Sequence, residues 1–219
     1  MYKIIKHKWD DRNKLFFSSD WHNFHEAMAW DVPIWKGRGY SSPEESWQDV
    51  INKINARVGE HDTIYYLGDS FLNVKDDLDV EDWFAKIKCQ NIMYLMGNHE
   101  STPYRIYKQQ VKEQYGLDDV EVYPLKWKNV TFLGNHQEIL VGKKVIVLNH
   151  FPISSHHHAG RGSWGLFGHT HGNYEQTLPQ YPIGKRLDMS WDVKNDIWSF
   201  DEIYDVMSTK TVEVLDHAR

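Results

Sequence analysis

The chain has 219 residues, 41% of them hydrophobic, which fits one globular domain over residues 1–219 with a substantial core. Its net charge of -6 makes it a poor candidate for holding duplex nucleic acid, and no apolar run approaches the roughly 20 residues of a membrane span. A single cysteine, Cys89, excludes an internal disulfide framework and, with an N-terminus unlike a secretory signal, predicts a cytoplasmic location.

The first half of the chain alternates between strand and helix patterns. Short apolar runs predict buried strands at residues 15–19, 63–67 and 91–96. A long loop is expected at residues 23–41, and the helix after it has Ser42 as N-cap and Gly59 at its end. Further helices are expected at residues 80–87 and 103–115.

The second half begins with strand patterns that have no helix between them. These runs predict antiparallel strands at residues 120–123, 130–133, 138–141 and 144–148, with a hairpin turn at Gly142-Lys143. A strand at 187–191 and a helix at 200–207 follow. Two packed sheets accommodate both halves, so we expect an α/β fold, a four-layer α/β/β/α sandwich of two packed mixed sheets with outer helices.

Five apolar runs each end on residues that can bind a metal ion. They lead into Asp20-Trp21-His22, Asp69, Asn98-His99-Glu100, His150 and His169-Thr170-His171. Open α/β sheets place their ligands just beyond the carboxyl ends of such strands, so we expect these residues to form one site.

The number of candidate ligands favours two ions over one. Seven side chains exceed one tetrahedral or octahedral site: Asp20, His22, Asp69, Asn98, His150, His169 and His171. Imidazole, carboxylate and amide ligands suit two divalent transition-metal ions that share a bridging carboxylate, from Mn, Fe, Zn or Ni, with Mn favoured. The positive charge of two divalent ions exceeds the negative charge of two aspartates. The site would therefore be net positive and attract a phosphate, although the chain as a whole is acidic.

The ordered set of motifs, each after a strand, resembles the calcineurin-like metallophosphoesterase family, and the stretch from Phe17 to Asp69 resembles its compact bacterial and phage members. The motifs are Asp20-Trp21-His22, Gly68-Asp69, Gly97-Asn98-His99-Glu100, Asn149-His150 and Gly168-His169-Thr170-His171. The resemblance covers nearly the whole chain. It implies a first metal held by Asp20, His22 and His171, a second held by Asn98, His150 and His169, and Asp69 as the bridge.

The resemblance also implies the catalytic residues. His99 would not be a ligand but would protonate the leaving oxygen or steady the transition state, and Glu100 would orient His99. The family more often has Asp at the position of Glu100. The run Gly68-Asp69-Ser70-Phe71 lacks the acidic residue and Arg of the protein-phosphatase branch, which argues against a protein Ser/Thr phosphatase.

The expected function is hydrolysis of a phosphodiester, or of a phosphomonoester, by in-line attack of a metal-bridging hydroxide. A diester is favoured because the short chain has no obvious cap domain, and the expected partner is a small phosphorylated or nucleotide-like substrate. Two alternatives stay open: a DNA or RNA nuclease with the same site, and a non-catalytic metal-binding interaction module.

Several other residues allow two interpretations each. His25 and Arg38 could reach the substrate or lie in solvent, and Trp21 or Trp164 could stack on a base or pack in the core. The triplet at residues 156–158 is expected in a solvated or substrate-facing loop, since adjacent histidines rarely converge on one ion. Asp188 and Asp192 are expected to pair with neighbouring groups. We expect the loops at 23–41 and 154–163 to decide substrate choice.

Overall fold

The computed structural model describes residues 4–24, 34–72, 74, 76–118, 120–174 and 184–212, and its core is a pair of packed mixed sheets. The six-stranded sheet has the order β11 (Trp198–Ser199), β2 (Leu15–Ser18), β3 (Thr63–Tyr66), β4 (Ile92–Tyr94), β6 (Val130–Phe132) and β5 (Leu125–Trp127). The five-stranded sheet has the order β1 (Ile5–His7), β7 (His136–Val141), β8 (Lys144–Asn149), β9 (Trp164–Phe167) and β10 (Arg186–Asp188). The predicted α/β fold of two mixed sheets is confirmed.

Parallel pairing brings the carboxyl ends of the central strands to the same edge of each sheet. In the larger sheet β2, β3, β4 and β6 are parallel, and in the smaller one β8, β9 and β10 are parallel. The expectation of antiparallel strands in the second half holds for the pairs β5–β6 and β7–β8 but not for β6 against β4.

Alternation along the strands divides the apolar residues between two clusters. Phe17 and Tyr65 point into the layer between the sheets, where they meet Ile146 and Leu166 of the smaller sheet. Their neighbours, such as Tyr66, point to the other face and pack under helices.

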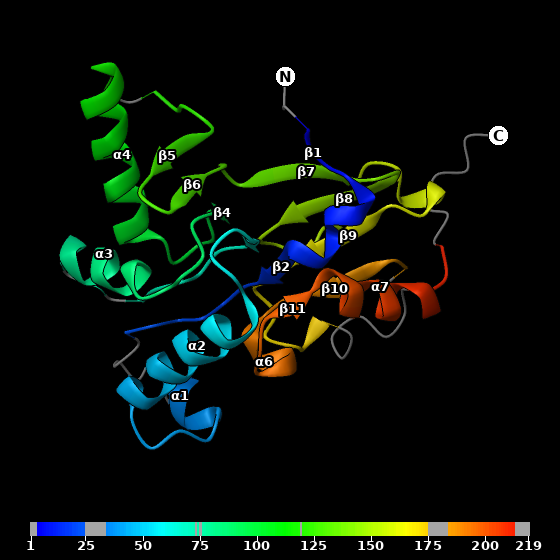
Figure 1. Cartoon of the computed structure of the whole chain (residues 1–219), viewed down its shortest axis with the longest axis horizontal. Helices are drawn as coiled ribbons and strands as arrows, with labels where there is room; N and C mark the ends of the chain where they lie inside the picture. The colour runs from blue at the N-terminus through cyan, green and yellow to red at the C-terminus, as the bar shows by residue number, and fades with distance from the viewer. Residues whose placement is uncertain are drawn as a thin grey trace.

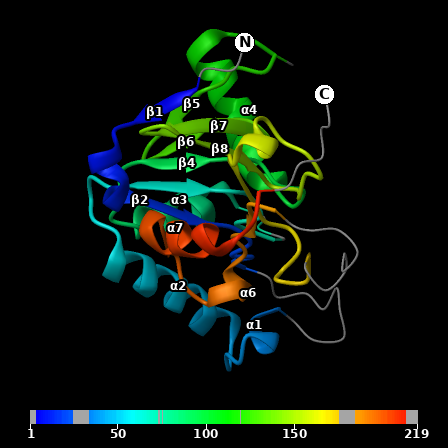
Figure 2. The ribbon, with the colours of Figure 1, turned by 90° about the vertical axis from the view of Figure 1, so that its right-hand side faces the viewer.

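Three helices cover that other face: α2 (Pro43–Arg57), α3 (Asp77–Ala85) and α4 (Ser101–Tyr115). Figure 1 shows α3 and α4 to the left of the strands and α2 below them, and in Figure 2 α3 and α4 lie behind the strands. Helix α7 (Phe200–Thr209) instead contributes Phe200, Ile203 and Met207 to the cluster between the sheets. Part of the outer face of the smaller sheet lies under the segment 150–163, which contains the short helix η2 (Ala159–Arg161).

Capping side chains set the first turns of α2 and α3. Ser42 Oγ accepts the Glu45 N–H at 3.2 Å, as predicted for α2. Helix α3 begins three residues before the predicted position 80, because the Asp76 carboxylate accepts the Leu78 N–H at 2.9 Å and caps an earlier turn.

The predicted strand at 120–123 is wrong. The Val122 N–H donates to the Tyr107 hydroxyl at 2.7 Å, and the same hydroxyl donates to the Val122 carbonyl at 3.2 Å, so neither group is available to a sheet. The strand in this region is β5, which begins at Leu125. The strand expected at 187–191 ends at Asp188, and the short helix α6 (Trp191–Lys194) follows.

Several other short elements were not predicted, among them η1 (Trp9–Lys14), β1, η2, β11, and α1 (Ile34–Gly37) inside the expected long loop. Within the described ranges, every helix is too short or too polar to cross a bilayer.

Candidate metal centre

The predicted metal ligands meet where the carboxyl edges of the two sheets face each other. Asp20 and His22 follow β2, Asp69 follows β3, His150 follows β8, and the remaining two histidines follow β9. The sheets are joined at this edge, because the ring nitrogen Nδ1 of His150 hydrogen-bonds to the Leu67 carbonyl at 2.8 Å. This contact leaves Nε2 of His150 facing the site.

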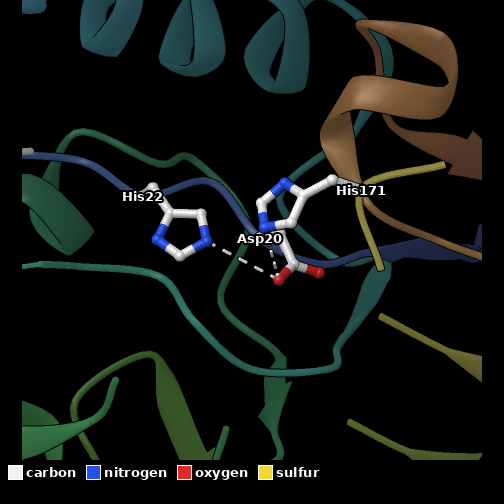
Figure 3. A group of neighbouring side chains, drawn as sticks. All are labelled: Asp20, His22 and His171. Atoms are coloured by element: carbon white, nitrogen blue, oxygen red, sulfur yellow. Dashed lines mark ion pairs between the residues drawn. The ribbon is translucent and has the colours of Figure 1, made fainter. Parts of the chain in front are cut away.

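Asp20, His22 and His171 form the first group (Figure 3). Both imidazoles point toward Asp20 Oδ1, and the Nε2 atom of each lies 3.7 Å from it. This separation is too long for a hydrogen bond but suits ligands that are each roughly 2.1 Å from a shared ion. Asp20 Oδ1 is buried and accepts no hydrogen bond from the described residues, and a buried carboxylate oxygen normally has a partner. The group therefore fits a cation.

The second oxygen of Asp20 is held by the protein. Asp20 Oδ2 accepts the His169 N–H at 2.9 Å and the hydroxyls of Ser19 and Ser190, the latter at 3.0 Å. These donors fix the carboxylate so that Oδ1 faces the two imidazoles. The sequence carries no specific signal for the two serines, since Ser190 lies far along the chain.

Asp69, His150 and His169 form the second group, and Asn98 adjoins it through its Oδ1, which lies 2.9 Å from His150 Nε2. Asp69 Oδ2 lies 3.4 Å from His150 Nε2 and 4.0 Å from His22 Nε2, so it stands between the groups. Asp69 Oδ1 accepts the His99 backbone N–H at 2.8 Å. This orientation fits a bridging carboxylate.

The charges in the site already favour cations. Burial alone raises the pKa of Asp20, but the imidazoles of His22 and His171 outweigh burial and hold this pKa well below its usual range. Burial likewise lowers the pKa of His150, and the Asp69 carboxylate outweighs it and raises that pKa. The carboxylates are thus ionised, and a divalent ion replaces imidazole protons when it binds.

Five of the predicted ligands have left-handed backbone conformations. Nine non-glycine residues in the described ranges have positive φ, and five of them are Asp20, His22, Asp69, His169 and His171, at φ 49–71°. Each such residue costs on the order of 1–3 kcal/mol and persists only where its surroundings enforce it. Here the Asp20 N–H donates to the Gly68 carbonyl at 2.9 Å, and the His22 N–H to that of Asp69 at 3.1 Å. The strain is concentrated at the site.

Two motif glycines allow the ligand loops to approach each other. A methyl group at Gly97 would overlap Asp69 Oδ1 and lie 2.8 Å from the Asp69 backbone nitrogen. A methyl group at Gly168 would overlap the Asp20 carboxylate in the same way. These glycines make room for the carboxylates themselves.

We expect Gly97→Ala to weaken metal binding and activity by about tenfold or more, because over-packing of roughly 1–3 kcal/mol falls on Asp69. Gly37→Ala is the matched control, since a methyl group there meets nothing within 4 Å. Metal titration and thermal unfolding of both variants check this. Equal metal affinity in the two variants would contradict it.

Asp192 supports the first group through His171. Its Oδ2 accepts from His171 Nδ1 at 2.7 Å, and its two oxygens also accept from Arg38 Nε and Nη2, each at 2.8 Å. Arg38 donates further to the carbonyls of Asp20 and Trp21, both at 2.7 Å. Its side chain is only 5% exposed. Its placement gives no support to the predicted phosphate clamp.

We expect Asp192→Asn to lower metal affinity at the first group by about 10- to 100-fold, because the orientation and basicity of His171 depend on this carboxylate. Asp196→Asn is the control, since Asp196 pairs with Arg57 at 2.8 Å away from the ligands. Isothermal titration with Mn²⁺ measures both. An unchanged first-site affinity in Asp192→Asn would show that His171 needs no support.

The hydrogen bonds recorded for the Glu100 carboxylate go to groups other than the His99 ring, so they do not support the expectation that Glu100 orients that imidazole. The Glu100 carboxylate accepts the Asp69 N–H and, at 2.5 Å, the Tyr94 hydroxyl. Residue 100 lies at the start of α4, and its side chain reaches back into the core, where burial raises its pKa to about 7. Glu100 thus holds the Asp69 loop. His99 is exposed, and its ring centroid lies 5.7 Å from that of His22.

Other candidates lie apart from the metal ligands. His25 falls outside the described residues. None of the histidines at 156–158 belongs to either group in the described chain, and His157 pairs with Glu138 at 3.0 Å. Trp21 and Trp164 are buried at 1% and 2% exposure, which leaves neither ring open to a base.

Asp188 pairs with neighbouring groups, as expected. Its carboxylate accepts the Thr170 hydroxyl at 2.6 Å and the Gly172 N–H at 2.8 Å, so it holds the loop that carries His169 and His171.

Comparisons with known proteins agree with this geometry. A model of the calcineurin-like phosphoesterase family matches residues 14–172, a span that contains all seven predicted ligands. The fold is similar to the crystal structure of a protein of unknown function from Aquifex aeolicus, with a TM-score of 0.58 and 18% identity over 88% of this chain and 98% of that one. That identity supports the fold alone. A search of curated proteins found no match.

Proposed function

The chain belongs to the calcineurin-like phosphoesterase family, and from this premise we propose that it hydrolyses a small phosphodiester at a centre of two divalent transition-metal ions, with Mn favoured. The observation that carries the proposal is the position of Asp69 Oδ2 between two groups of ligands, 3.4 Å from His150 and 4.0 Å from His22. Two ions that share one carboxylate supply, when bound, an activated water and positive charge for an in-line displacement at phosphorus.

The residues of the chain orient and complete this chemistry. Asp69 uses Oδ1 to hold the His99 N–H and keeps Oδ2 directed toward both groups. The His99 ring, exposed beside the first group, is free to donate a proton to the leaving oxygen. Glu100 and Tyr94 hold the Asp69 loop from the core side.

The charges around the site favour a diester over a monoester. A monoester carries a second negative charge, and enzymes that bind one commonly place an arginine beside the metals to share that charge. Arg38 was predicted to bind a phosphate, but its guanidinium N–H groups donate hydrogen bonds to Asp192 and to two backbone carbonyls. A diester needs no such partner.

The test is metal content followed by hydrolysis of two aryl phosphates. Protein loaded with Mn²⁺ is expected to bind two ions per chain and to hydrolyse bis-p-nitrophenyl phosphate faster than p-nitrophenyl phosphate. A chelator should abolish turnover, and Mn²⁺ should restore it. Two bound ions without turnover of any ester would overturn the proposal in favour of a metal-binding interaction module. Cleavage of long DNA or RNA with a steep salt dependence would favour a nuclease.

A further inference from the structure

A pocket of about 410 Å³ opens beside the metal centre and is separate from the residues that hold the ions, except at Asn98. Its wall includes side chains from three segments: Asn98, Ser101, Tyr104, Glu121, Tyr123 and Asn135. The volume lies within the ~300–1,000 Å³ typical of small-molecule sites. Because Asn98 lines the pocket and adjoins the second group of ligands, a group bound in the pocket would lie next to a phosphate at the metals.

The aromatic wall of the pocket is held by ring contacts and backbone hydrogen bonds. Tyr107 stacks between two pocket residues, with ring centroids 5.9 Å from Tyr104 and 4.8 Å from Tyr123. The Tyr107 hydroxyl bonds the N–H and the carbonyl of Val122, which ties the 120–124 segment to α4. Tyr104 remains 42% exposed at the surface of this stack. A preformed aromatic wall lowers the entropy cost of binding a flat ring.

The lining of the pocket disfavours a second phosphate. No lysine, arginine or histidine is among its lining residues in the described chain. Glu121 is exposed there as a hydrogen-bond acceptor, whereas Glu100 is buried and bonded to Tyr94. A ligand with N–H donors suits Glu121, and the Asn135 amide can both donate and accept. The pocket therefore favours an uncharged, flat group that donates hydrogen bonds.

From these features we propose that the pocket binds the nucleoside part of the substrate, with an amino-bearing base packed on the Tyr104 and Tyr123 wall and its N–H groups directed at Glu121. The proposal rests on the proposed function, because it joins this nucleoside to a phosphodiester at the metals. On this proposal the pocket residues between Asn98 and Asn135 select the base. The loops at 23–41 and 154–163, which were expected to decide substrate choice, would not select it.

Titration of the Zn²⁺-loaded protein with guanosine, adenosine and uridine tests the site without turnover, because nucleosides carry no phosphate. Diamagnetic Zn²⁺ is used here because Mn²⁺ would broaden the nearby NMR signals. Guanosine and adenosine are expected to bind more tightly than uridine, with amide shifts at Ser101 and Asn135 in NMR spectra. Tyr104→Ala should weaken each nucleoside by about 5- to 150-fold, the range for loss of one stacked base. Tyr104→Phe and Tyr115→Ala, the latter at an exposed tyrosine at the far end of α4, should bind as the wild type does. Glu121→Gln should reduce the preference for guanosine over uridine.

A paired kinetic measurement separates this proposal from the proposed function. The p-nitrophenyl esters of guanosine 5′-phosphate and of ethyl phosphate share one leaving group, and the guanosine ester is expected to have the lower KM. Tyr104→Ala should remove this difference in KM. Nucleoside binding that depends on Tyr104, without turnover of either ester, would uphold the pocket and reject the function. Turnover of both esters with equal KM and no nucleoside binding would reject the pocket alone.

Discussion

Asp69→Asn is expected to lose metal from both groups and to lower kcat/KM by roughly 10³-fold or more. Asp69 Oδ2 is the atom that stands between the groups, 3.4 Å from His150 Nε2 and 4.0 Å from His22 Nε2. An amide keeps the shape of the side chain and an acceptor for the His99 N–H. It removes the negative charge and cannot bridge two cations when its NH₂ occupies this position.

Metal analysis by mass spectrometry and turnover of a diester measure this result together. Asp10→Asn, at an exposed carboxylate on η1, controls for the loss of one negative charge. Circular dichroism checks that Asp69→Asn folds, which we expect because the variant removes a buried charge from a metal-free site. Retention of two ions in Asp69→Asn would argue against the bridge.

His99→Gln is expected to leave metal content unchanged and to reduce kcat by about 10²- to 10⁴-fold on a diester with an alkoxide leaving group. The substitution removes only the imidazole, since the contact of residue 99 with Asp69 Oδ1 is made by its backbone N–H at 2.8 Å. The loss should be much smaller with p-nitrophenolate, because that leaving group is stable without a proton. The difference between the two substrates is the signature of a general acid.

His61→Gln, at an exposed histidine away from the predicted ligands, is the control for this variant. A loss of the same size on both leaving groups would assign His99 to stabilisation of the transition state instead. Loss of metal in His99→Gln would make it a ligand, contrary to the expectation.

Much of the fold follows from local signals that a sequence contains. The N-cap Ser42 predicts the start of α2 because its hydroxyl satisfies an N–H three residues away. The proximity of the seven predicted ligands follows because each lies at a strand end, and parallel strands bring these ends to one edge. The chemistry of carboxylate and imidazole then limits what such a cluster can bind.

Other features depend on residues that are distant in the chain. Arg38 and Asp192 are 154 positions apart, and only the tertiary fold brings them together, so that Arg38 holds the carboxylate that supports His171. The direction of the Glu100 side chain likewise depends on the Tyr94 hydroxyl and the Asp69 N–H in the core. A predicted strand near Val122 failed because a tyrosine hydroxyl on α4 takes both of its backbone groups.

The sequence by itself therefore determined the kind of fold and the residues able to hold metal, because strand ends, caps and donor atoms are local properties. The tertiary structure decided which oxygen of Asp69 faces the two groups, which ligands adopt left-handed backbone, and which tyrosines form a pocket beside Asn98. These are relations between side chains from different elements. Such relations form only when the chain folds. Burial then removes water as a hydrogen-bond partner, and each buried polar group bonds to the protein group that packing places beside it.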